Sequence, residues 1–156
     1  MKGLVPMHTK YIFRVYGRWH GGIDGQGEIV NEEQTVRTPF GIAEEFGGTG
    51  GPTNPEELFL SAACSCYLIT LAYVAEKMRL PVKTLECEAE GRVSSHEEGG
   101  FHFTEVILKP HFELDGDPKA HDMAIARAVR LAEQRCIISR AVKGTVKYEI
   151  KPTVKA

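Results

Sequence analysis

Residues 53–75 read TNPEELFLSAACSCYLITLAYVA, and this stretch decides how the rest of the chain folds. Thr53 or Asn54 is suited to cap a helix, and Pro55 fits its first turn. The two glutamates that follow favour the positive end of the helix dipole. Residues 58–75 contain no charge, and apolar side chains lie on every side of the helix. The pattern predicts a long central helix that is buried all round.

A helix this long and apolar could also span a membrane. Ser61, Ser65 and Thr70 interrupt it, however, and no other segment resembles a span. We therefore expect no membrane segment. A central helix wrapped by β-sheet, either within one chain or across two subunits, fits the pattern better.

The composition is that of an ordinary globular protein, with 156 residues, 42% hydrophobic and 26% charged side chains. A net charge of -2 gives no basic surface for nucleic acid. The histidines are scattered, and none lies at a zinc-ligand spacing from a cysteine. A chain this long can build a core without disulfides, and its first residues lack the apolar segment of a signal peptide. We expect a cytoplasmic protein without metal or cofactor, with residues 1–9 as a flexible leader and residues 10–156 as a single domain.

The segments on both sides of the helix predict β-strands, because they are rich in β-branched and aromatic residues. The expected strands lie at 10–19, 28–30, 34–38, 84–93, 101–114 and 145–151. A second helix is expected from Asp117, as N-cap, to about Cys136. Pro110 lies inside a strand and predicts an edge position or a bulge, because proline lacks a backbone N–H. The order β-β-β-α-β-β-α-β is typical of an α+β fold.

The chain has four cysteines, Cys64, Cys66, Cys87 and Cys136. Cys64 and Cys66 are rotated by about 200° on the helix, so they face opposite sides and cannot bridge each other. Cys87 lies in a strand and is expected in the core, whereas a helix end could expose the sulfur of Cys136. A Cys66–Cys136 pair would be chemically sensible, because a thiol can condense with a sulfenic acid to a disulfide. Spacing alone does not establish this pair.

Residues 53–59, the alanines at 62 and 63, and Cys66 together resemble the signature of the OsmC/Ohr family of peroxide-handling proteins. In that signature an Asn-Pro-Glu-(Glu/Gln)-Leu run opens the central helix, and the reactive cysteine comes twelve residues after the asparagine. This count selects Cys66 over Cys64. The segment around Cys136 resembles the second-cysteine segment of the family, and the resemblance extends from residue 19 to residue 148.

The resemblance implies an intertwined homodimer in which sheets wrap around long central helices, with two sites at the interface. It implies a thiol-dependent peroxidase for organic hydroperoxides. Cys66 takes the peroxide oxygen, Cys136 forms the disulfide, and a dithiol reductant such as a lipoyl group restores both thiols. Glu56 matches the acidic residue that holds an arginine beside the thiolate. Since Glu56 lies ~15 Å of helical rise from Cys66, we expect it to serve the partner subunit's Cys66.

The chain departs from the family at its arginine. Ile23 replaces the arginine of the Ohr branch, and Glu45 stands where the OsmC branch has one. A thiol in a buried helix has a raised pKa unless a cation or dipole lowers it. Arg37, or else Arg18, is the predicted substitute.

A second departure is that Cys-Ile-Ile-Ser, residues 136–139, replaces the usual Cys-Pro-x-Ser of the family. Two alternatives to the peroxidase stay open on the sequence. One is an OsmC-like protein that binds an apolar ligand, and the other is a redox sensor, both without efficient turnover.

Overall fold

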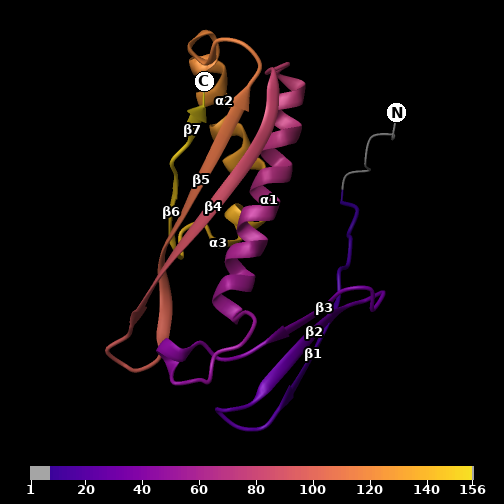
Figure 1. Ribbon diagram of the computed structural model, residues 1–156, viewed down its shortest axis with the longest axis vertical. Coiled ribbons are helices and arrows are strands. Elements are labelled where there is room, and N and C mark those ends of the chain that lie inside the picture. Colours follow the sequence, from indigo (N-terminus) through magenta and orange to yellow (C-terminus); the bar gives the residue numbers. More distant parts are fainter. Residues whose placement is uncertain (1–7, 156) are drawn as a thin grey trace. The chain divides into compact units, whose positions relative to one another are not determined.

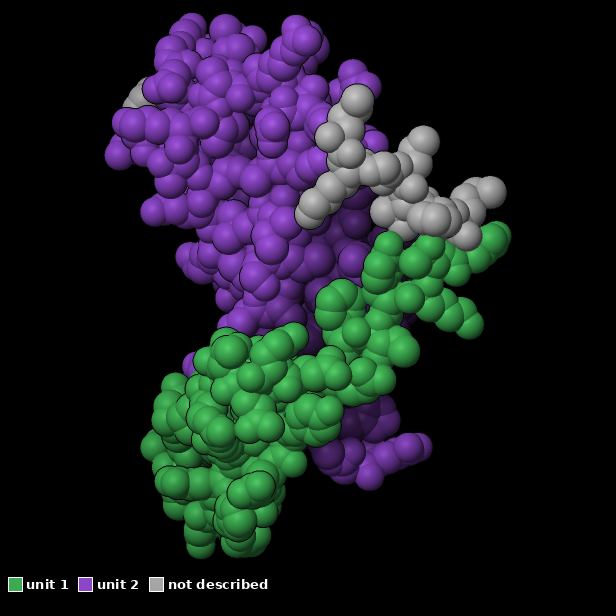
Figure 2. Space-filling model, turned by 90° about the vertical axis from the view of Figure 1, so that its right-hand side faces the viewer, with its two compact units in different colours: residues 1–55 green, residues 56–156 purple. Residues whose placement is uncertain are grey.

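The order of helices and strands in the computed structural model confirms the predicted α+β fold. The structure describes residues 8–155 and divides the chain into two compact units, residues 1–55 and 56–156 (Figure 1, Figure 2). The predicted leader, residues 1–9, lies outside the described residues except for its last two. The single domain over 10–156 stays a prediction, and each unit is described by itself.

The first unit is a three-stranded antiparallel sheet in the order β1-β2-β3. Its elements are β1 (Val15–His20), β2 (Gln26–Asn31), β3 (Arg37–Phe40) and the short 3-10 helix η1 (Glu44–Phe46). The strand expected at 10–19 therefore begins five residues later. The reason is that β2 ends at Asn31, opposite Val15, so residues before Val15 have no strand to pair with.

The second unit places its helices on one face of a four-stranded sheet (Figure 1). Its strands are β4 (Val82–Ser95), β5 (Phe101–Leu114), β6 (Lys147–Ile150) and β7 (Thr153–Lys155). Its helices are α1 (Pro55–Lys77), the 3-10 helix η2 (Pro118–His121), α2 (Asp122–Arg135) and α3 (Ile137–Val142). Asp117 caps as predicted, but it caps η2, which leads into α2. The last predicted strand is split into β6 and β7.

The core lies between α1, α2 and the side of β5 that faces them. Tyr67 and Leu71 of α1 and Leu108 and Phe112 of β5 are fully buried. The prediction that α1 is buried all round is wrong for the single chain, since the Ile69 side chain is 72% exposed. The sheet and α2 cover only one side of the helix. Among residues 8–155, α1 is the one helix long and apolar enough to cross a membrane, by length and composition alone.

Pro110 lies in the central strand of the sheet, so the predicted edge position or bulge is wrong. It pairs with Cys87 of β4 in regular register. The carbonyl of Leu108 accepts a hydrogen bond from the backbone N–H of Lys151, so the backbone of Leu108 faces β6 and β7. Backbone groups alternate in direction along a strand, so Pro110, two residues further on, faces the same way. Pairing with β6 ends at Leu108 and pairing with β7 begins at His111. The missing N–H of Pro110 therefore falls at a gap between two partner strands.

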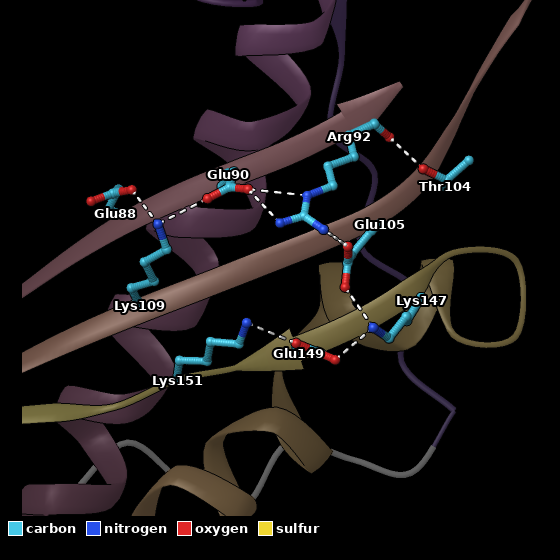
Figure 3. A network of polar contacts seen from close by, with 9 residues as sticks. All are labelled: Glu88, Glu90, Arg92, Thr104, Glu105, Lys109, Lys147, Glu149 and Lys151. Carbon is cyan, nitrogen blue, oxygen red and sulfur yellow. Dashed lines mark hydrogen bonds and ion pairs between the residues drawn. The ribbon is translucent and has the colours of Figure 1, made fainter. Parts of the chain in front are cut away.

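The opposite face of this sheet carries a network of alternating charges (Figure 3). Its centre is Glu105 of β5, whose carboxylate accepts hydrogen bonds of 2.7 Å from both Arg92 and Lys147. Lys109 bridges Glu88 and Glu90 at 2.7 and 2.9 Å. These charges keep one face of the sheet polar, while the helices pack against the other.

Candidate active site around two cysteines

The two cysteines of the predicted pair come from different elements of the second unit. Cys66 lies about three turns into α1 and is half-buried. Cys136 lies between α2 and α3: its N–H donates to Ala132 at the end of α2, and its sulfur accepts from the N–H of Ser139 at 3.5 Å. The expectation that a helix end exposes its sulfur is wrong. Cys136 is fully buried, because the chain continues directly into α3 and its side chain joins the core.

The structure brings the sulfurs of Cys66 and Cys136 together, as the sequence could only suggest. The thiol of Cys136 donates a hydrogen bond to the sulfur of Cys66. Both cysteines are free thiols. The two thiols are therefore neighbours in the folded chain.

The surroundings of Cys66 favour its thiolate. Burial alone raises the pKa of the Cys66 thiol, but hydrogen bonds from the backbone of Ile138, the thiol of Cys136, the backbone of Ile137 and the hydroxyl of Thr70 outweigh it. The net result is a pKa below the usual thiol value. The first N–H groups of a helix have no partner within the helix, so the start of α3 can give them to the sulfur.

These backbone donors are the part of the site that sequence reasoning missed. Any residue type can supply an N–H, so the isoleucines carry no chemical signal of their own. The one available signal was the spacing of Cys136 and Ser139, which fits a residue that caps a short helix. The residue pattern shows that the family arginine is missing, whereas the structure provides backbone N–H groups that donate to the sulfur of Cys66.

Thr70 follows Cys66 by one helical turn and lies within reach of two of its atoms. Its hydroxyl donates to the carbonyl oxygen of Cys66 at 2.8 Å and also contributes to lowering the pKa of the thiol. A hydroxyl has one hydrogen, so it serves one acceptor at a time. Ionisation of the thiol makes the sulfur the stronger acceptor, and Thr70 can then turn to it.

The surroundings of Cys136 keep it protonated. Burial raises the pKa of the Cys136 thiol, and Ser139 offsets only part of that effect. The Ser139 hydroxyl donates to the phenol oxygen of Tyr148 at 2.9 Å, and burial raises the pKa of Tyr148 to about 12. The surroundings thus shift the two thiols in opposite directions: the pKa of Cys66 is lowered, which favours its thiolate, and the pKa of Cys136 is raised, which favours its protonated form.

A cavity of about 310 Å³ opens next to the Ser139–Tyr148 pair. It is lined by Glu133, Gln134, Ser139, Arg140, Lys143 and Tyr148. No group of three or more histidine, cysteine or carboxylate side chains suitable for a metal occurs within residues 8–155.

Arg37 and Arg18, the predicted substitutes for the family arginine, belong to the first unit. The Arg37 guanidinium lies 2.8 Å from the carboxylate of Glu28. Together with Arg18 it lines a small cavity on the sheet of that unit. The contact of either arginine with Cys66 therefore stays a prediction.

Glu56 lies in the first turn of α1, which runs without a break to Cys66 and beyond. One oxygen of its carboxylate is buried and has no hydrogen-bond partner among the described residues. A buried carboxylate without a partner is costly, and native proteins seldom leave one unsatisfied. Glu56 is therefore an acceptor that can still take a donor.

Comparisons with known proteins give one consistent result. The model of the family described as OsmC-like protein matches residues 48–151. The chain is 35% identical to protein YmaD of Bacillus subtilis over 144 residues, which are 92% of this chain and 94% of that one. It is 27% identical to peroxiredoxin OsmC of Escherichia coli over 138 residues, 85% and 92% of the two chains. The crystal structure of the organic hydroperoxide resistance protein OhrB of Bacillus subtilis superposes with a TM-score of 0.68 at 25% identity, covering 92% of this chain and 98% of that one.

Proposed function

The chain belongs to the OsmC-like protein family, and on this premise we propose that it is a thiol peroxidase that reduces organic hydroperoxides through Cys66 and Cys136. The observation that carries the proposal is the contact between the two thiols, in which the more acidic sulfur faces a protonated one. The names of two relatives, a peroxiredoxin and an organic hydroperoxide resistance protein, support the choice of substrate.

The first step is attack by the Cys66 thiolate on the outer oxygen of the hydroperoxide. A sulfur–oxygen bond forms, the oxygen–oxygen bond breaks, and the alkoxide leaves and takes up a proton to become an alcohol. The hydrogen bonds that lower the pKa of Cys66 raise the fraction of reactive thiolate at neutral pH. Cys66 is half-buried, so peroxide can reach its sulfur, whereas Cys136 is fully buried.

The second step joins the two cysteines. The sulfur of Cys136 attacks the sulfenic sulfur of Cys66, and water leaves with the sulfenic oxygen and the proton of the Cys136 thiol. The step joins two thiols that are already neighbours in the folded chain. A dithiol reductant, lipoyl or similar, then exchanges with the disulfide and returns both thiols. This cycle requires a reducing compartment, so the proposal includes a cytoplasmic location.

The proposal includes a homodimer with the sites at its interface. The exposed apolar side of α1, with Ile69 and Tyr73, is a surface that a second copy can cover. Because α1 is continuous, Glu56 lies ~15 Å of helical rise from Cys66 of its own chain. In the dimer, its unsatisfied oxygen would hold an arginine beside the partner subunit's Cys66. Arg37 is the first candidate, since it would exchange the exposed partner Glu28 for a buried one.

The test combines kinetics with mapping of the disulfide. Reduced protein is mixed with cumene hydroperoxide or hydrogen peroxide, thiol loss is followed in time, and the product is mapped by mass spectrometry. We expect faster reaction with the organic peroxide and a Cys66–Cys136 disulfide. Cys66→Ser should lower the rate by at least about 1000-fold. Cys136→Ser should keep the first step and accumulate a sulfenic acid that dimedone traps, without turnover on a dithiol.

Cys64→Ser is the matched control, since it removes a thiol from the same helix and should leave the peroxidase rate unchanged. A disulfide that excludes Cys136, or no acceleration of Cys66 oxidation over a free thiol, would overturn the proposal. Oxidation without turnover on any dithiol would instead favour the redox sensor.

A further inference from the structure

The two remaining cysteines also lie against each other, on the other side of α1. Cys64 is half-buried on the side that faces β4, and its thiol donates to the carbonyl oxygen of Cys87 at 3.2 Å. Cys87 is half-buried in β4, an edge strand of the sheet, and its thiol lies 3.5 Å from the carbonyl of Glu88. The two side chains are also within hydrogen-bonding contact of each other. The sequence predicted Cys87 as a core residue and gave no reason to pair it with Cys64.

We propose that Cys64 and Cys87 form a second redox pair, which organic hydroperoxides oxidise to a disulfide after the Cys66–Cys136 pair. Cys64 comes from the helix that carries Cys66, and Cys87 comes from the strand beside it. The disulfide ties the part of α1 that holds the reactive cysteine to the edge of the sheet. It is a modification site separate from the peroxidase pair and does not depend on it.

The chemistry balances with hydroperoxide as the only oxidant. The sulfur of Cys64 takes the outer oxygen of the peroxide, the oxygen–oxygen bond breaks, and an alcohol leaves. The sulfur of Cys87 then attacks the sulfenic sulfur of Cys64, and water leaves with the sulfenic oxygen and the thiol proton of Cys87. Two thiols and one hydroperoxide give one disulfide, one alcohol and one water.

The order of oxidation follows from the surroundings of the two pairs. Burial, and then the neighbouring Cys64, raise the pKa of Cys87 to about 12, so this thiol is protonated at neutral pH. A protonated thiol is a poor nucleophile, and the second pair closes slowly. Cys66 by contrast receives donors from α3, Thr70 and Cys136. The second pair therefore responds to sustained exposure rather than to single turnovers.

The experiment removes the first pair and asks whether the second still closes. The full-length Cys66→Ser/Cys136→Ser variant keeps only Cys64 and Cys87. Treated with excess cumene hydroperoxide, it should lose both titratable thiols and the mass of two hydrogen atoms. Its peptide map should contain a Cys64–Cys87 cross-link within one chain. We expect oxidation to be roughly 100-fold or more slower than that of Cys66 in the unmodified protein.

Two further samples keep the test decisive. Adding Cys87→Ala to the same variant leaves Cys64 alone, which should then accumulate as a sulfenic acid trapped by dimedone. In the unmodified protein, increasing doses should give the Cys66–Cys136 cross-link first and the Cys64–Cys87 cross-link later. The proposal is overturned if the two thiols stay titratable at high dose, or if only cross-links between different chains form. Because the variant lacks Cys66 and Cys136, its result does not depend on the peroxidase activity.

Discussion

At the residue scale, the acidity of Cys66 depends on a few hydrogen-bond donors and not on the position of the residue in α1. The helix N-terminus lies about three turns away, too far for its dipole to help. Burial works against ionisation, and only the donors from α3, Cys136 and Thr70 reverse it. Because several donors share this task, the thiolate should tolerate the loss of one better than the loss of α3.

Thr70→Val tests one of these donors. The change removes the hydroxyl and nearly keeps the volume, so the pKa of Cys66 should rise. The rate of reaction with peroxide at neutral pH should fall by about 3- to 10-fold, since a hydrogen bond to a charged group is lost. The measurement is the pH profile of the rate, which rises with the thiolate fraction and levels off above the pKa. In the variant the midpoint should move to higher pH, with an unchanged plateau.

Thr70→Ser keeps the hydroxyl and is the control for this profile. An unchanged midpoint in Thr70→Val would contradict the role of the hydroxyl.

The dependence of stability on pH gives a second readout of the acidity of Cys66. The pKa of Cys66 is lower in the folded chain than in the unfolded one, so between the two values the unfolded chain binds more protons. The resulting contribution to the free energy of unfolding is complete above the pKa that Cys66 has in the unfolded chain. It is lost as the pH falls through the pKa that Cys66 has in the folded chain, and Thr70→Val should weaken it.

At the scale of elements, the charge network joins the strands of the second unit. Glu105 is its only largely buried carboxylate among the described ion pairs, with a side chain 9% exposed, and it contacts cations of both neighbouring strands, Arg92 of β4 and Lys147 of β6 (Figure 3). Glu88 contacts Lys109 at the same 2.7 Å, but its side chain is 67% exposed. Water screens the exposed Glu88–Lys109 pair, so ion pairs of equal length do not contribute equally to the stability of the fold.

Glu105→Gln should therefore lower the free energy of unfolding by about 1–3 kcal/mol, because two charge-assisted hydrogen bonds are weakened near the interior. Glu88→Gln, the matched control, should change it by less than about 0.5 kcal/mol. The measurement is urea unfolding followed by far-UV circular dichroism. Equal effects of the two substitutions would show that burial of Glu105 does not strengthen its ion pairs.

At the scale of the whole molecule, α1 presents an apolar side that the single chain leaves uncovered. Ile69 and Tyr73 are exposed there, one turn apart, while Tyr67 and Leu71 face the core. A stretch without charges that is only half covered favours association with a second copy. The proposed function makes this association a condition of activity, because Glu56 cannot reach Cys66 of its own chain.

Ile69→Lys should separate the proposed dimer, since a charge placed in an apolar interface has no partner there. We expect the dissociation constant to rise by about 100-fold, equivalent to nearly 3 kcal/mol. Peroxidase activity should fall in parallel at low protein concentration. The measurement is size-exclusion chromatography with light scattering, beside the activity assay.

Met123→Lys is the control, because Met123 is an apolar residue on α2 that is even more exposed than Ile69. It should leave both the assembly and the activity unchanged. A monomeric Ile69→Lys protein with full activity would contradict the requirement for a dimer and for Glu56 of the partner.

The sequence by itself determined the α+β order, the long helix from Pro55 and the second helix behind Asp117. The roles of Cys66 and Cys136 follow from the family resemblance and stay predictions. The helices and strands are encoded in short stretches of chain, through helix caps and apolar periodicity. Local interactions between near neighbours decide them.

Only the tertiary structure decided what the cysteines touch. It placed the N–H groups of Ile137 and Ile138 at the sulfur of Cys66, buried Cys136, and set Cys64 against Cys87. It also placed Pro110 at a gap between strands and left one side of α1 bare. These facts depend on which distant segments pack together, and backbone donors carry no residue signature. The sequence therefore indicates where a reactive thiol lies, and the packing of α1 against α3 determines how that thiol ionises.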